Sequence, residues 1–294
     1  MAIFLYPNDT PKKIFNRCKF LLRSFIYHSE LMRMYFLFQE PQLKSLPENH
    51  PELLDKPLRP YRFAAANAKK RAQMIEEHYH LLSILFPNEI MALYNKNGVS
   101  LGRLPISQYN VVLCYDGTFR REGELTISII NEQGIRLYSC AFSLAGNIKD
   151  LTLVIGAVQG PAPTIENAPE IIRTMTKELH GLRPKSFVVM LVIIFAKIIK
   201  ANNIQAVKKS AHVFQAKRYS KKQKFKLHSD YDSLWHEFGA VEIDEHLFQL
   251  NPPQKKPLDE IIPKKRAMYR RRYDYLEGIE KDIISKFSAS TRYV

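Results

Sequence analysis

The chain has 294 residues, of which 46% are hydrophobic, 25% charged and 11% aromatic. This length allows one large domain or two smaller ones, and this composition excludes a disordered, collagen-like or disulfide-rich secreted protein. Lys and Arg outnumber Asp and Glu by 44 to 29, which gives a formal net charge of +15, and most of the excess lies after residue 180. Such a charge favours anionic partners in general and does not choose among nucleic acid, phospholipid and phosphate-bearing ligands.

The cysteines and the apolar segments bound the compartment. Cys18, Cys114 and Cys140 are isolated and form no CxxC motif, so they indicate neither a disulfide framework nor a metal site. The N-terminal apolar stretch precedes its basic residues, the reverse of a secretory signal. The apolar run at 187–196 is shorter than the roughly 20 residues that span a bilayer. We therefore expect a cytoplasmic protein, with peripheral attachment to the inner membrane left open.

The first third of the chain, residues 1–97, is expected to be helical. Residues 11–40 carry apolar side chains at helical steps of three and four, with Lys and Arg between them. We expect this apolar stripe to pack on the protein's own core, while a position on an anionic membrane surface is the alternative. Five prolines between residues 41 and 60 predict a connector, and helices are expected over 64–85 and 88–95.

After Gly98 the pattern changes to that of strands. Four runs rich in Val, Ile, Leu, Tyr and Thr, separated by breaks that contain Gly or Asn, predict an antiparallel meander over residues 109–160. Helices over 165–179 and 184–201 follow, then a strand, a short helix, another strand and a charged helix over 263–287. The order predicts an α+β fold with a mostly antiparallel sheet. We divide it into a helical region 1–97, an α+β domain 98–255, and a basic helix and tail 256–294.

Two motifs predict a site for an anionic ligand. A buried strand ends at a glycine, where a backbone can approach a ligand closely, although a plain turn is the alternative. Farther on, Arg183 and Lys185 flank a proline at the start of an apolar helix. Cations there oppose the helix dipole unless an anion lies between them, and pairing with nearby acids or solvation is the alternative. The candidate ligand-binding residues are Gln159, Gly160, His180, Gly181, Arg183 and Lys185.

Acid–base groups follow the next strand. His212 comes after it, and Tyr231 and Glu237 belong to a segment that reads as a short helix. Tyr, His and carboxylate side chains are usable acids and bases, so these three are candidate catalytic residues. The apolar members of the same segment predict core packing as the alternative purpose.

Two basic clusters complete the candidates. Aromatic residues interleave with the cations, as in proteins that bind single strands or RNA, but no recognised nucleic-acid module is present. An anionic membrane surface or a purely solvated face are the alternatives. The residues singled out for nucleic-acid or membrane binding are Lys221, Lys222, Lys264, Lys265, Arg266 and Arg270.

A resemblance rests on four blocks in order: IGAVQGP, LHGLRPKSF, the stretch from KKSAHVF to HEFGA, and IPKKRAMYRRRYDYL. Together they resemble the VirK/YbjX family of Gram-negative bacteria, over residues 20–280. That family is a domain of unknown function linked to virulence and to envelope or antimicrobial-peptide stress. The resemblance therefore implies a biological setting more than a mechanism.

The order of elements is also similar, at the level of the fold, to GNAT N-acyltransferases. In that superfamily, amides at the start of the long helix hold the pyrophosphate of acyl-CoA, and a Tyr or His protonates the leaving thiolate. This resemblance implies an acyl-CoA site at residues 180–186 and an acid–base role for His212 or Tyr231 near Gln159. The usual RxxGxG/A glycines are absent, with Gly181 alone nearby. An acyl-tRNA, another donor, or no donor are the alternatives.

Two hypotheses about function result. The first is a cytoplasmic acyltransferase of GNAT type. The second is a non-catalytic basic protein that binds RNA or an anionic membrane surface. The sequence leaves the oligomeric state open.

Overall fold

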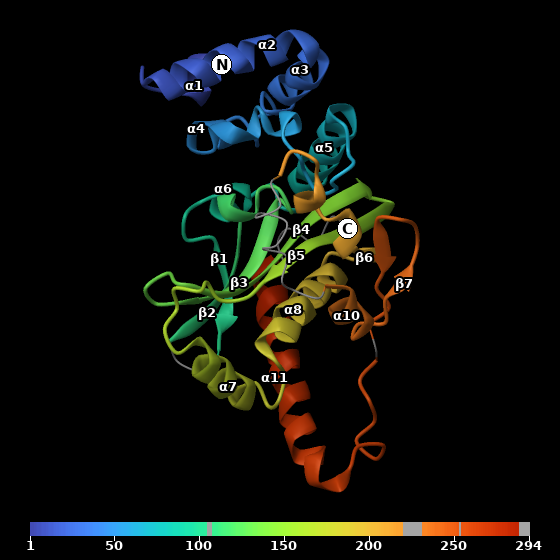
Figure 1. Cartoon of the computed structure of the whole chain (residues 1–294). Coiled ribbons are helices and arrows are strands. Elements are labelled where there is room, and N and C mark those ends of the chain that lie inside the picture. Colours follow the sequence, from blue (N-terminus) through green and yellow to red (C-terminus); the bar gives the residue numbers. More distant parts are fainter. Residues whose placement is uncertain (105–107, 220–230, 253, 288–294) are drawn as a thin grey trace.

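The computed structural model describes residues 1–104, 108–219, 231–252 and 254–287 (Figure 1). Its first third is helical, as predicted. The elements before the sheet are α1 (Ala2–Leu5), α2 (Pro11–Ile26), α3 (His28–Leu37), α4 (Leu46–Asn49), the 3-10 helices η1 (Pro51–Leu53) and η2 (Lys56–Leu58), α5 (Ala68–Leu85) and α6 (Ile90–Leu93). The prolines of the connector explain why only short helical turns form between α3 and α5.

A mostly antiparallel eight-stranded sheet forms the centre of the molecule, which confirms the predicted α+β class. Its order is β1-β2-β3-β4-β5-β6-β8-β7. The strands are β1 (Val99–Arg103), β2 (Tyr109–Cys114), β3 (Leu125–Asn131), β4 (Arg136–Asn147), β5 (Asp150–Gln159), β6 (Asn203–Val207), β7 (Val241–Glu242) and β8 (Leu247–Gln249). The remaining elements are η3 (Gly117–Phe119), α7 (Ala168–Glu178), α8 (Pro184–Ile198), η4 (Lys209–Ala211), η5 (Val213–Gln215), α10 (Tyr231–His236) and α11 (Pro263–Phe287).

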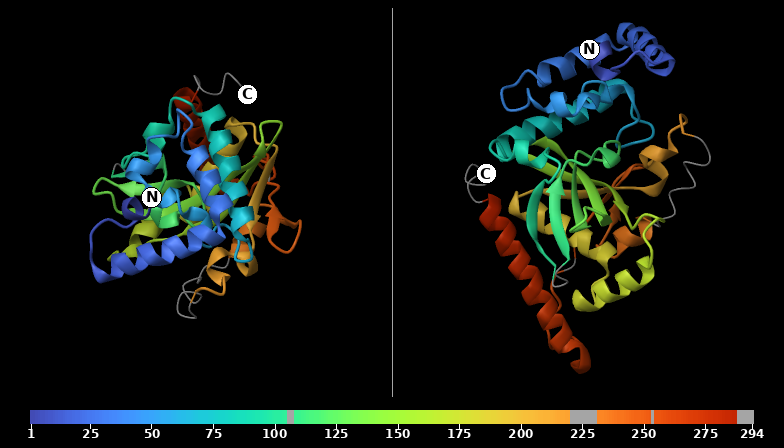
Figure 2. Two further views of the ribbon diagram at one scale, coloured as in Figure 1. Left: turned by 90° about the horizontal axis from the view of Figure 1, so that it is seen from above. Right: turned by 90° about the vertical axis from the view of Figure 1, so that its left-hand side faces the viewer.

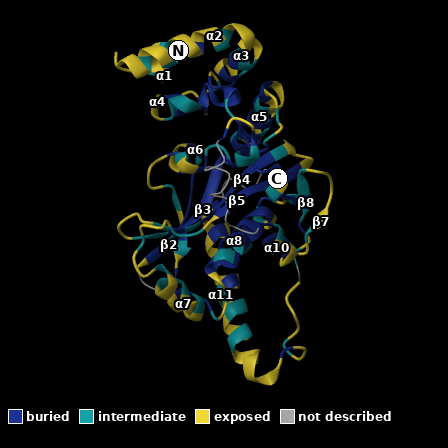
Figure 3. Ribbon diagram, in the orientation of Figure 1, coloured by how far each residue is buried: buried dark blue, intermediate teal, exposed yellow. Residues whose placement is uncertain are grey.

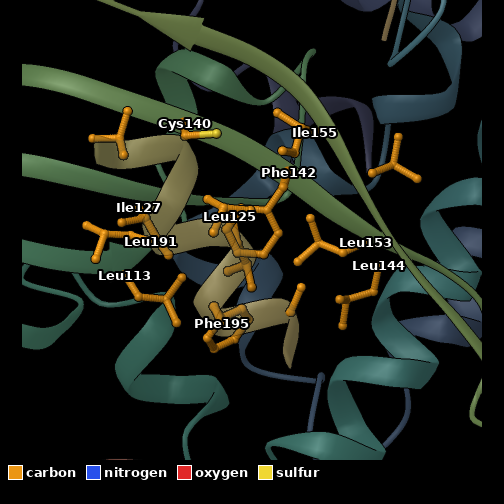
Figure 4. Packing of buried hydrophobic residues seen from close by; sticks show 14 of the residues in the cluster. Leu113, Leu125, Ile127, Cys140, Phe142, Leu144, Leu153, Ile155, Leu191 and Phe195 are labelled. Atoms are coloured by element: carbon orange, nitrogen blue, oxygen red, sulfur yellow. The ribbon is translucent and has the colours of Figure 1, made fainter. Parts of the chain in front are cut away.

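One crossover sets the geometry of the sheet. β5 and β6 are parallel, and α7 followed by α8 connects the end of β5 to the start of β6. Since α8 is apolar around almost its whole circumference, it is stable only when it is buried on most sides. Figure 4 shows Leu191 and Phe195 of α8 among inward-facing side chains of β3, β4 and β5, such as Phe142. The phenyl rings of Phe142 and Phe195 lie 5.7 Å apart.

The N-terminal helices join the sheet through α5 and a buried ion pair. α5 lies along the part of β4 that extends beyond its pairing with β3, where the amide of Leu144 donates to Nδ1 of His78 (3.1 Å). Lys56 Nζ donates to Glu124 Oε2 at 2.6 Å, and both side chains are buried. Breaking one partner of such a pair leaves an uncompensated buried charge, so the pair couples the two regions. Figure 2 shows the helices stacked over one side of the sheet.

One hydrophobic cluster draws residues from α3, the sheet, α8 and α11. The three-part division of the chain therefore stays a prediction about boundaries within a shared core. The meander, the buried helix and the charged helix lie where they were expected, whereas the short strand β1 was not foreseen.

The expectation for the N-terminal stripe is wrong for α2. Phe20 is the one buried residue of this helix, and its other large apolar side chains are exposed. Figure 3 shows α1 and α2 mainly in the colour of exposed residues. Only α3 buries its apolar face as expected, with Leu31, Met34 and Leu37.

Candidate functional site

The pairing of the parallel strands β5 and β6 stops before the carboxyl end of β5. It runs from Thr152–Asn203 to Ile155–Ala206 and ends because β6 stops at Val207, whereas β5 continues to Gln159 paired with β4. The start of α10 lies near this end of β5, since Tyr231 is within hydrogen-bonding reach of the backbone of Val158. Trp235 Nε1 donates to the carbonyl of Val207 on β6 (3.1 Å). The resemblance to GNAT N-acyltransferases implied acid–base chemistry near Gln159, at this end of β5.

A β-bulge marks the same point on β5. The register with β4 shifts between Ala141 and Phe142, opposite Gly156. A Cβ built on Gly156 would lie 1.8 Å from the carbonyl oxygen of Glu122. Because no side chain fits at that distance, glycine is required, and the loop before β3 can lie directly on the bulge.

That loop carries Glu122, a residue that sequence reasoning missed. Glu122 is 6% exposed, and its Oε2 has no hydrogen-bond partner within the described part of the chain. Burial raises the pKa of Glu122 to about 7, because desolvation disfavours the charged carboxylate. A carboxyl group that titrates near neutral pH can serve as a general base. No local motif distinguishes Glu122 from its neighbour Glu124, so only the fold could identify it.

His212 and Tyr231, two of the predicted catalytic residues, are brought together. Their rings stack with centroids 5.5 Å apart, and both side chains are buried. His212 Nδ1 accepts from the amide of Phe214 (3.3 Å), which leaves the proton of the neutral ring on Nε2, an atom without a partner in the described residues. Burial lowers the pKa of His212 to about 4, so the ring is neutral at pH 7.

Tyr231 links these groups to Glu122 and to β5. Burial raises the pKa of the Tyr231 phenol, and the charge of Glu122 raises it further, while the backbone of Val158 opposes the shift by hydrogen bonding. The phenol therefore keeps its proton at neutral pH. A protonated Tyr, a neutral His and a titratable Glu thus lie close together beside the carboxyl-terminal half of β5.

The segment at residues 61–64 holds the surroundings in place. The amide of Arg62 donates to the carbonyl of Arg121 (2.8 Å), and the amide of Ala64 donates to the carbonyl of Ala211 (2.9 Å). Arg62 itself is 3% exposed and has a left-handed φ of 57°, and its Nε and Nη2 find no acceptor in the described chain. A strained residue with unsatisfied buried donors often belongs to a binding site.

Glu237, the third predicted catalytic residue, lies elsewhere. Ser186 Oγ, in the first turn of α8, donates to Glu237 Oε2 at 3.0 Å. A carboxylate at this position is stabilised by the amino-terminal end of the helix dipole. The sequence left a bound anion and pairing with nearby acids as alternatives at this helix start, and Glu237 is an acid that lies there.

The predicted ligand-binding residues form two groups. His180, Gly181 and Arg183 line a cavity of about 770 Å³ between α7, α8 and α11. Its lining has four cations and one carboxylate: Arg173, Lys177, Arg183, Arg271 and Glu178. Gln159 and Gly160 are not among the lining residues, because Gln159 extends toward Arg136 (3.5 Å) and Gly160 lies against the ring of Tyr138. Lys185 is partly buried in the first turn of α8.

Only one of the two predicted basic clusters has its singled-out residues within the described part of the chain. Lys264, Lys265, Arg266 and Arg270 are exposed on the first turns of α11. Arg266 is fixed by bonds from Nε to the carbonyl of Ile261 and from Nη2 to that of Asp259 (both 2.9 Å). Lys221 and Lys222 lie outside the described residues.

Two other observations bear on the site. In the described ranges, no three His, Cys, Asp or Glu side chains are grouped so that they could hold a metal ion. No helix in the described part of the chain has both the length and the apolar character needed to cross a bilayer.

The chain belongs to a family described as "Protein of unknown function (DUF535)", whose model matches residues 9–285. This confirms the resemblance to the VirK/YbjX family. The uncharacterized protein YbjX of Escherichia coli K12 is 34% identical over 92% of this chain and 83% of its own length. An uncharacterized protein of Haemophilus influenzae is 27% identical over 95% of the chain and 90% of its own length. A protein of Mannheimia haemolytica called "Membrane protein LapB" is 26% identical over 61% of the chain and 77% of its own length.

Proposed function

We propose that this protein is an acyltransferase of GNAT type that transfers an acyl group from an acyl-CoA to an amine, in the setting of envelope stress or virulence that its family resemblance implies. The observation that carries the proposal is the burial of Glu122, His212 and Tyr231 close to the part of β5 that extends beyond its pairing with β6. Buried titratable groups with shifted pKa values cluster at reaction sites.

The chemistry assigns a role to each group. Glu122 takes the proton of the attacking amine, because its pKa of about 7 suits a base at neutral pH. The amine nitrogen forms a bond to the thioester carbonyl carbon, and the carbon–sulfur bond breaks. Tyr231 gives its proton to the leaving thiolate. His212, with a proton on Nε2, donates a hydrogen bond to the carbonyl oxygen as negative charge develops there.

The donor's phosphates would contact the cavity between α7, α8 and α11. Arg183 and Arg271 both line it, and cations there can neutralise a pyrophosphate. Because the Glu237 carboxylate already occupies the first turn of α8, the phosphates are expected to depend on these side chains more than on free amides of the helix.

Stabilisation by acyl-CoA tests this proposal. Thermal unfolding of the full chain is measured with acetyl-, octanoyl- and palmitoyl-CoA. We expect at least one thioester to raise the melting temperature, and Arg271→Ala to weaken its binding at least tenfold. The matched control is Arg103→Ala, an exposed arginine on β1 outside the cavity, which should bind as the wild type does.

The alternative function, binding of RNA or an anionic membrane by the basic clusters, has one observation in its favour: Lys264, Lys265 and Arg270 are exposed along one helix. No shift with any acyl-CoA, together with salt-sensitive RNA or vesicle binding that is lost when these three are changed to Gln, would replace the acyltransferase by this alternative.

A further inference from the structure

The amphipathic helix α2 presents an unpartnered apolar face. Phe25 is 83% exposed, Ile26 73%, Leu22 68% and Phe15 65%. Positions 14, 15, 18, 21, 22, 25 and 26 share one side of a helix at 3.6 residues per turn. The preceding α1 adds Ile3, which is 71% exposed. A contiguous apolar face of this size on a soluble chain marks an interaction surface.

Cations border this face. Lys12, Lys19 and Arg23 follow one another at steps of seven and four residues, so they form a line along one edge of the apolar side. In the described residues of α1–α3 and their connections, the acids are Asp9 and Glu30, and Asp9 is paired with Arg17 at 2.7 Å. The surface therefore combines apolar side chains with a net positive charge.

A cationic cavity lies at the carboxyl end of α2. It has a volume of about 700 Å³, and Arg23, Arg71, Lys217 and Arg218 line it together with Tyr27. Among the described residues, no Asp or Glu lines this cavity. The cations come from α2, α5 and the segment after η5, so three distant parts of the chain converge on one cavity. The nearby carboxylate of Asp55 lines an adjoining cavity and is paired with Arg59.

The guanidinium groups in this cavity are only partly satisfied. Arg71 Nη1 donates to the carbonyl of Pro57 (3.1 Å), but its Nε is buried and has no acceptor in the described chain. Arg218 Nη1 donates to the carbonyl of Leu58 (3.4 Å). Burial, and then the charge of Arg23, lowers the pKa of Arg218. Clustered cations that lose hydration need an anion to compensate them.

We propose that α1 and α2 dock on an anionic phospholipid bilayer. The apolar face of α2 inserts among the acyl chains at the surface, Lys12, Lys19 and Arg23 contact the headgroups, and a lipid phosphate enters the cavity at Arg71 and Arg218. Amphipathic helices with bulky apolar residues on one side and cations at its border bind membranes in this manner.

A bilayer fits this surface better than a second copy of the chain. A two-fold contact through α2 would place the same row of cations opposite itself, and like charges across an interface disfavour association. The position of the surface also suits a bilayer, since Figure 1 shows α1–α3 at the end of the molecule opposite the exposed end of α11.

Co-sedimentation of the full chain with vesicles tests the proposal. One set of vesicles contains phosphatidylglycerol with phosphatidylcholine, and the other contains phosphatidylcholine alone. We expect binding to the anionic set, and at least a tenfold weaker affinity for Leu22→Ser/Phe25→Ser. Arg71→Gln should weaken binding to the anionic set several-fold. The matched control, Val241→Ser/Ile243→Ser, removes two exposed apolar side chains near β7 and should bind as the wild type does.

Three results would overturn the proposal. These are wild-type protein that stays in the supernatant with anionic vesicles, a Leu22→Ser/Phe25→Ser variant that sediments as the wild type does, and equal binding to both vesicle sets. Light scattering identifies the rival occupant: a wild-type dimer that becomes monomeric in the same variant, without vesicle binding, would assign the surface to a second copy. Since both changed residues are exposed, circular dichroism should show an unchanged fold.

Discussion

The two helices α8 and α2 both carry many apolar residues, but they differ in how far these residues are buried. α8 is apolar on nearly every side, and eleven of its residues are buried against the sheet and its neighbours. α2 carries its exposed apolar residues on one face, and Phe20, on the opposite side, is its one buried residue. The difference shows that an apolar stripe does not by itself determine what covers it. The core stabilises α8, whereas the face of α2 is available to a partner.

The largest expected effect is a difference in how much a truncation in each helix lowers the stability of the protein. Phe195→Ala on α8 should lower the free energy of unfolding by about 3–5 kcal/mol, because it leaves a cavity among Phe86, Phe142 and Phe287. Phe25→Ala on α2 should change it by about 0.5 kcal/mol or less, because the side chain is exposed. Denaturant titration measures both. A loss of several kcal/mol in Phe25→Ala would mean that α2 is covered by the protein after all.

A smaller effect concerns the reaction site and depends on pH. The folded pKa of Glu122, about 7, lies above the usual value of 4.5. Its contribution to stability is therefore fully present below pH 4.5 and is lost as the pH rises through 7. Glu122→Gln removes this loss. Between pH 5 and pH 8, the free energy of unfolding of the variant should therefore rise relative to that of the wild type by up to about 3 kcal/mol. Unfolding titrations at several pH values measure the difference.

The lowered pKa of His212 makes stability depend on pH in the opposite direction. Its folded pKa of about 4 lies below the usual 6.5, so its contribution is present above pH 6.5 and is lost as the pH falls toward 4. In the wild type, the contributions of Glu122 and His212 to the pH dependence of the free energy of unfolding partly cancel between pH 4.5 and 6.5. If Glu122→Gln follows the wild-type pH profile at every point, the carboxyl group titrates normally and cannot be the proposed base.

Much of the fold could be predicted because local patterns carry it. The charged helix over 263–287, the meander and the helix of 184–201 all follow from hydrophobic period and from breaks at Gly, Pro and Asn. Strand β1 escaped detection because Val99–Arg103 is short and contains a glycine. The exposure of the apolar face of α2 was not predicted, because periodicity identifies an apolar face but does not show whether other parts of the protein pack on it.

The site was predictable only in part. His212 and Tyr231 were chosen for their chemistry, and the fold stacks them. Glu122 was missed because its burial arises from the close approach of its loop to Gly156, a contact between distant segments. The cavity at Arg71 and Arg218 was missed for the same reason. At the start of α8 the sequence left a bound anion and pairing with nearby acids as alternatives, and it could not show that the acid Glu237 lies there.

The most direct test of the acyltransferase proposal is the release of free CoA from acyl-CoA in the presence of a panel of amine acceptors, with the acylated product identified by mass spectrometry. We expect the wild type to release CoA with at least one acceptor, and Glu122→Gln and Tyr231→Phe each to lower the rate by about 10²-fold. Release of CoA at the wild-type rate by both variants, or no release with any donor and acceptor, would contradict the proposed roles of Glu122 and Tyr231.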